Sequence, residues 1–107
     1  MRLRASTVDC RVLDDNGHDA LPAFTVSPSR NSTLVHVSGD RYLDLALRPL
    51  SPTIRVYMLS VPHSPWTFGE KLLGETELKL DSRPGVQSRV SIGTVYPGGN
   101  LECSRVR

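Results

Sequence analysis

The spacing of proline is the feature that most limits how this chain of 107 residues can fold. A proline inside a helix removes a backbone hydrogen bond and clashes with the preceding turn, so a helix ends close to each one. Few windows between the prolines exceed about a dozen residues, and a long helix is therefore excluded. The eight prolines are Pro22, Pro28, Pro49, Pro52, Pro62, Pro65, Pro84 and Pro97.

Within these windows, apolar residues alternate with polar ones, which is the period of a β-strand. Leu43, Leu45 and Leu47 show this alternation along one segment, and Ile54, Val56 and Met58 show it along the next. Turn residues such as glycine, asparagine and proline separate the segments. We expect strands near residues 2–13, 22–27, 33–38, 41–48, 53–60, 72–80, 87–95 and 100–106. The pattern predicts one all-β domain over residues 1–107, an eight-stranded antiparallel β-sandwich.

The net charge argues against a nucleic-acid partner, and the N-terminal sequence indicates where the protein is located. The net charge of +2, from 13 basic and 11 acidic residues, is small for a nucleic-acid-binding protein. The predicted strands also lack exposed aromatic residues on which bases stack, so we expect no nucleic-acid partner.

The sequence begins at Met1 without the apolar run of a signal peptide. We therefore expect an intracellular, cytoplasmic protein, of which this is the N-terminal domain.

Two cysteines, Cys10 and Cys103, lie near opposite ends of the chain. If the first and last strands were neighbours, the two could form a disulfide. The intracellular expectation instead favours two half-buried free thiols, because disulfides are rare in the cytosol. The triplet Asn31-Ser32-Thr33 matches a glycosylation sequon, which carries no weight without a signal peptide.

Three segments resemble a known family in their order and spacing. The first runs from Leu13 to Val26 and includes Asp14-Asp15-Asn16-Gly17. The second is Ile54-Arg55-Val56-Tyr57 followed, after a loop, by Leu72 to Leu80 with Leu73-Gly74-Glu75. The third is Val90 to Ile92 with the tail from Gly98 to Cys103. Together they resemble the C2 domain family, in which an eight-stranded sandwich presents loops that bind calcium, membranes or proteins.

The residues matching the calcium loops depart from the family pattern. Calcium-binding C2 domains share several aspartates between the first and third loops, and calcium requires six to eight oxygen ligands. This chain retains Asp14 and Asp19 in the first loop, while the third, from Ser60 to Gly69, has no acidic residue. We expect calcium independence and no cofactor, with Asp14 and Asp19 as vestigial metal candidates at most. A solvated turn capped by aspartate and asparagine side chains is the preferred interpretation of this segment.

The long loop from Val61 to Lys71 is the first candidate for partner binding. It carries His63, Trp66 and Phe68 beside two prolines, and tryptophan is frequent at the energetic centres of protein interfaces. The open alternative is that the two aromatic residues pack against one end of the core. We expect protein–protein contact or self-association through this loop tip or through an exposed sheet edge. The resemblance to C2-like domains without calcium ligands implies such a role in a scaffold or assembly, including those of centrioles and cilia.

Two further functions stay open at this stage. One is a peripheral membrane module in which Arg41, Arg55 and Arg89 line one sheet face and bind anionic phospholipids. The other is an unrelated, secreted β-sandwich, such as a transthyretin-like or immunoglobulin-like domain, which an oxidised Cys10–Cys103 pair would favour.

No pattern of residues indicates catalysis. His18, His36 and His63 lie on separate segments, without the spacing of a zinc site. No serine lies in a Gly-x-Ser-x-Gly turn. We expect a non-enzymatic protein in which His36 lies on the exposed side of its strand.

Overall fold

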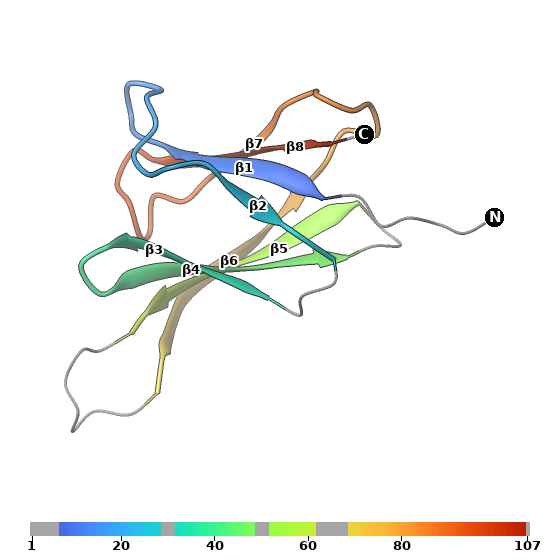
Figure 1. Ribbon diagram of the computed structural model, residues 1–107. Coiled ribbons are helices and arrows are strands. Elements are labelled where there is room, and N and C mark those ends of the chain that lie inside the picture. Colours follow the sequence, from blue (N-terminus) through green and yellow to red (C-terminus); the bar gives the residue numbers. More distant parts are fainter. Residues whose placement is uncertain (1–6, 29–31, 49–51, 62–68, 107) are drawn as a thin grey trace.

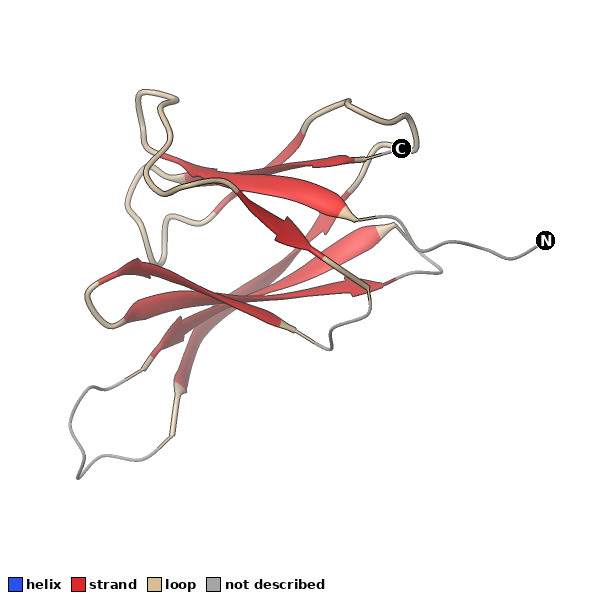
Figure 2. Ribbon diagram, viewed as in Figure 1, coloured by secondary structure: helices blue, strands red, loops and turns tan. Residues whose placement is uncertain are grey.

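The computed structural model describes residues 7–28, 32–48, 52–61 and 69–106. These residues form eight β-strands in two four-stranded sheets (Figure 2). Their bounds are β1 (Val8–Leu13), β2 (Phe24–Val26), β3 (Thr33–Ser38), β4 (Arg41–Arg48), β5 (Thr53–Ser60), β6 (Lys71–Lys79), β7 (Ser88–Ser91) and β8 (Asn100–Arg105). The described residues form no helix that could span a membrane.

The two sheets lie as separate layers, and all strand pairs are antiparallel (Figure 1). Sheet A has the order β2-β1-β8-β7, and sheet B has the order β3-β4-β5-β6. Neighbouring strands are consecutive in the chain except for β1 and β8, the first and the last. The chain therefore follows an up-and-down course that passes between layers after β2 and after β6. The predicted fold class, an eight-stranded antiparallel β-sandwich, is confirmed.

The strand boundaries agree most closely in sheet B, where residues 33–38, 41–48 and 53–60 form strands as predicted. Sheet A differs more. β1 begins at Val8, and residues 2–6 of its predicted strand lie outside the described residues. β2 has only three residues, starting at Phe24 rather than at position 22. β7 ends at Ser91 because the carbonyl of Ile92 accepts the N–H groups of Val95 and Tyr96, which turns the chain before position 95.

The core lies between the layers and follows the predicted alternation. Leu43, Leu45, Ile54 and Val56 are fully buried, and each of these side chains stabilises the fold by about 1.5–3 kcal/mol. Sheet A contributes its own inward-facing side chains, among them Val8, Cys10, Val12, Leu101 and Cys103.

The expectation of half-buried free thiols is wrong. Cys10 of β1 and Cys103 of β8 are paired directly across the sheet and joined by a disulfide. Both residues are buried, with exposed fractions of 2% and 0%. The pair forms because β1 and β8 are neighbours in sheet A, which brings the two ends of the chain together.

Candidate functional site

The outward face of sheet B carries a row of apolar and aromatic side chains across all four strands; His36 and Leu72 in it are exposed, whereas Leu59 is buried, at 5%. His36 is paired with Tyr42, Tyr42 with Leu59, and Leu59 with Leu72. Residues paired in this way lie on the same face of a sheet. The rings of His36 and Tyr42 stack with their centroids 4.7 Å apart. We call these four residues the outer row.

A second set of side chains extends this surface. Leu34 is paired with Asp44, and Asp44 with Tyr57. Leu34 and Leu72 are the large hydrophobic residues described as exposed, at 58% and 52%. The guanidinium of Arg55 lies over the ring of Tyr57, 4.7 Å from its centroid. Leu34 and Tyr57, with the outer row, form what we call the outer patch.

Hydrogen bonds hold the hairpin between β3 and β4 against the end of β5. The hydroxyl of Ser60 donates to Asp40 Oδ2 at 2.8 Å, and the N–H of Val61 donates to the Asp40 carbonyl at 2.7 Å. On the other side, His36 Nε2 lies 2.7 Å from the carbonyl of Gly39. These contacts orient the ring of His36 and join the hairpin to the end of β5 beside the outer row.

Charged residues lie on the same face. Glu75 is paired with Tyr57, so with Asp44 it lies within the second set of the outer patch. Arg48 pairs with Glu77 at 3.6 Å nearer the start of β5, where Lys79 is also exposed. The apolar side chains of this face are therefore densest beside the β3–β4 hairpin, and the charges increase toward the start of β5. Apolar side chains gathered at one end of a face are a common mark of a protein interaction surface.

The residues predicted to bind a partner, His63, Trp66 and Phe68, lie outside the described residues. The ends of their loop are described, since β5 ends at Ser60 and β6 begins at Lys71. Leu59 and Leu72 are the strand residues next to these ends, so the loop leaves and rejoins the sheet beside the outer row.

The three arginines expected to bind lipid do not line one face. Arg41 lies on β4 with the alternation of the core residues, and its Nε is 3.3 Å from Asp40 Oδ1. Arg55 is on the outward face of sheet B, above Tyr57. Arg89 belongs to sheet A, where it binds Glu102. This separation removes the common basic surface that the membrane hypothesis requires.

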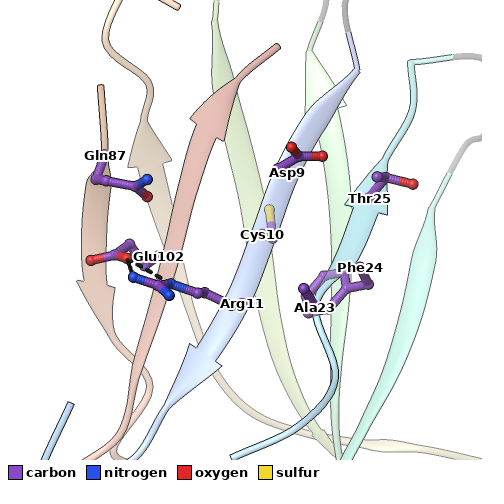
Figure 3. A pocket seen from close by; sticks show the side chains of 8 residues that line it. All are labelled: Asp9, Cys10, Arg11, Ala23, Phe24, Thr25, Gln87 and Glu102. Atoms are coloured by element: carbon purple, nitrogen blue, oxygen red, sulfur yellow. Dashed lines mark hydrogen bonds and ion pairs between the residues drawn. The ribbon is translucent and has the colours of Figure 1, made fainter. Parts of the chain in front are cut away.

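Sheet A has a hollow of about 380 Å³ on its outward side, spanning β2, β1 and β8 (Figure 3). Asp9, Arg11, Thr25, Gln87 and Glu102 line it, together with Cys10, Ala23 and Phe24. Figure 3 shows Arg11 directed toward Glu102, on the side away from Ala23 and Phe24.

Glu102 is held between two arginines of the neighbouring strands. Arg11 Nε and Nη2 donate to Glu102 Oε1 at 2.9 and 2.8 Å, and Arg89 Nη2 donates to Oε2 at 2.8 Å. Although it faces outward, the Glu102 side chain is only 6% exposed, against 45% and 54% for the arginines. The hydrogen bond from Arg89, with those from Arg11, lowers the pKa of Glu102 below its ordinary value. Because its charged groups bind each other, we regard this cluster as structural.

The aspartates of the first loop lie where a capped turn requires them. Asp14 Oδ1 accepts the N–H groups of Asn16 and His18, each at 2.9 Å, which confirms the predicted turn. The hydrogen bond from His18 is the main cause of a lowered pKa at Asp14. Asp19 lies 3.7 Å from Arg11. Within the described ranges, no group of three or more metal-ligating side chains comes together.

Sequence reasoning placed His36 correctly on the exposed side of its strand, but it missed the outer row and the Glu102 cluster. Both depend on the register between strands, which brings together residues such as His36 and Leu72, far apart in the chain. The available signal was the alternation itself, which puts Tyr42 and Tyr57 on the polar side of β4 and β5. The expectation that the strands carry no outward aromatic residues is therefore wrong. Aromatic residues at outward positions of a strand indicate a candidate interaction surface.

Comparison of the chain with models of protein families, with curated proteins and with solved structures found no match in any of the three. The resemblance to C2 domains therefore has no support beyond the motifs on which it was based.

Proposed function

We propose that this domain is a non-enzymatic recognition module that binds a partner protein through the outer patch. The observation that supports it is a pair of exposed leucines on the face that carries the stacked His36 and Tyr42: Leu34 lies beside His36 on β3, and Leu72 lies on β6 at the other end of the outer row. A protein partner that covers this surface removes apolar side chains from water, which is the main driving force of association. Leucine and tyrosine held on a rigid sheet lose little conformational entropy on binding.

We further propose that the module works in an oxidising compartment, rather than in the cytoplasm expected from the sequence. The support is the buried disulfide between Cys10 and Cys103, since such bonds persist mainly in secreted and extracytoplasmic proteins. Alkylation of free thiols at cell lysis, followed by mass spectrometry of the Cys10 and Cys103 peptides, tests this. Recovery of both peptides as alkylated free thiols would contradict the proposed location.

The proposed binding surface is tested by site-specific photo-crosslinking. A photoreactive phenylalanine analogue is placed at position 72 on sheet B, or as a control at Thr25, which is exposed on sheet A. We expect a protein to be captured from position 72 alone. An excess of the unmodified chain should compete for that protein, whereas the Tyr42→Lys/Leu72→Lys variant should not.

Vesicle binding distinguishes the membrane alternative. If the chain co-sediments with anionic vesicles and dissociates as salt rises, while no protein is captured at position 72, the partner is a lipid surface and the proposal fails. Binding to neither vesicles nor protein also contradicts it.

A further inference from the structure

The four edge strands of the two sheets differ in how well they are protected. An edge strand exposes unpaired N–H and C=O groups, and proteins block such edges with short strands, prolines or charged side chains. In sheet A, β2 has three residues between Pro22 and Pro28, and β7 has four residues that include Arg89. In sheet B, β6 has nine residues but carries exposed charges at Lys71, Glu75, Glu77 and Lys79.

The remaining edge, β3, has none of these protections. Its six residues, Thr33–Ser38, include no proline, lysine, arginine, aspartate or glutamate. Within the described part of the chain, no backbone hydrogen bond outside the sheet ladders involves β3. Its pairing with β4 is regular from Thr33 to His36, and the register shifts only between His36 and Ser38. From Thr33 to His36, the open side of β3 therefore presents a regular, uncharged edge.

We propose that β3 pairs with β3 of a second copy of this chain, antiparallel and about a two-fold axis, so that two sheets B join into one eight-stranded sheet. The backbone of an edge strand requires an extended partner, and the sequence of β3 fits itself. With Val35 opposite its own copy, Thr33 lies opposite Val37, and Leu34 lies opposite His36 of the second copy. No like charges face each other, and β-branched residues pair with one another on the inward side.

A second copy is favoured over an unrelated strand because pairing with it covers the exposed side chain of Leu34. Leu34 is the most exposed large hydrophobic residue described, at 58%, and in this register it packs beside an imidazole ring of the other chain. The two outer patches then lie side by side on one continuous sheet face. The inference goes beyond the proposed function, because self-pairing uses the edge of β3 and leaves the Leu72 side of the patch open.

The test is sedimentation of the oxidised 107-residue chain over a range of concentrations. Strand pairing alone buries less surface than a standard interface of roughly 1,600 Å², so we expect dimers only at high concentration. In the Leu34→Lys/His36→Lys variant, lysines face lysines whether the axis lies at Val35 or at His36, and dimers should be lost. Its control is Glu75→Lys, which changes the net charge of this face by the same +2 but on β6, and it should dimerise normally.

A variant of opposite charge shows whether dimers are lost through repulsion or through misfolding. The Leu34→Glu/His36→Glu variant should be monomeric alone and should form a heterodimer when mixed with the lysine variant. In hydrogen exchange, alternate β3 amides of the natural chain should slow at high concentration, while β6 amides should not change.

Three results would overturn the proposal: a chain that stays monomeric at millimolar concentration, equal loss of dimers in Glu75→Lys, or no concentration-dependent protection in β3. Each of them leaves the capture of a partner at position 72 unaffected, so failure of self-pairing is distinguishable from failure of the proposed function.

Discussion

Cys10 and Cys103 lie opposite each other in β1 and β8, with their Cα atoms 4.1 Å apart, and their disulfide joins residues separated by 93 positions. The bond links the first strand of the chain to the last at the centre of sheet A. A cross-link over so long a loop stabilises a protein chiefly by restricting its unfolded chain, in the chain-entropy description. It therefore compensates for the small core of a domain of this length.

We expect loss of this disulfide to lower the free energy of unfolding by about 4–5 kcal/mol. Each kcal/mol shifts the Tm of a domain of this size by ~4–8 °C, so the melting temperature should fall by tens of degrees. Thermal unfolding followed by circular dichroism, with and without reductant, measures the change. The Cys10→Ala/Cys103→Ala variant should melt low in both conditions. Equal melting temperatures for the oxidised and reduced natural chain would contradict this expectation.

The two arginines around Glu102 should behave as a coupled pair. Arg11→Met or Arg89→Met alone leaves the carboxylate with one guanidinium partner, so each should lower the free energy of unfolding by less than half as much as both changes together. The double variant leaves a buried charge without a partner, which costs about 3–5 kcal/mol. Urea denaturation of the four proteins in this cycle gives the coupling. Strict additivity of the two single changes would show that Glu102 does not depend on both arginines.

Asp81 should titrate well below an ordinary aspartate. Its Oδ1 accepts the backbone N–H and the Nε–H of Arg83 at 2.8 and 3.0 Å, and its Oδ2 accepts Nη2 at 3.0 Å. The side-chain hydrogen bond from Arg83 is the main reason that the pKa of Asp81 falls to about 2. Because the pKa of Asp81 is lower in the folded chain than in the unfolded chain, its ionised carboxylate stabilises the fold at pH values above the unfolded pKa. This stabilisation is lost as the pH falls through the folded pKa of about 2.

Carbon-detected NMR titration of the Asp81 carboxyl group measures this pKa directly. In Arg83→Gln the backbone N–H still donates but the guanidinium is absent, so the pKa should rise part of the way toward its ordinary value. An unchanged pKa in that variant would assign the shift to the backbone alone.

The same substitution at two leucines tests the register of sheet B. Leu45 is fully buried in β4, whereas Leu34 in the neighbouring β3 is 58% exposed. We expect Leu45→Ala to cost about 2–5 kcal/mol, since it leaves a cavity. Leu34→Ala should change stability by at most about 0.5 kcal/mol. Chemical denaturation compares the two, and similar losses would mean that the faces of the sheet are misassigned.

How much the sequence could predict depended on whether a feature was local or between strands. The alternation of Leu43 and Leu45 with polar neighbours is local, so the strands of sheet B and their buried faces followed from it. The disulfide depends on the pairing of β1 with β8, which the alternation of residues along one strand cannot reveal. The expected cytoplasmic location had favoured free thiols, which was wrong. Glu102 required the same register, because an outward-facing glutamate is buried only where arginines of two neighbouring strands cover it.

Two glycines with positive φ offer a final comparison, because only one has a neighbour in the way. Gly98, in the turn before β8, has φ of +76°, and a Cβ added there would lie 2.7 Å from Asp15 Cβ. Gly17 has φ of +82°, with no atom within 4 Å of an added Cβ. Gly17→Ala should therefore cost only the strain of a left-handed backbone, about 1–2 kcal/mol.

Gly98→Ala should cost that strain and a further ~1–3 kcal/mol, because Asp15 and the loop after β1 must move to admit the methyl group. Urea denaturation of both variants measures the difference. A larger loss at Gly98 indicates that the turn before β8 and the loop after β1 pack as one unit. Equal losses would mean that the β1 loop moves aside freely, and the contact between Gly98 and Asp15 would then play no part in holding that end of sheet A together.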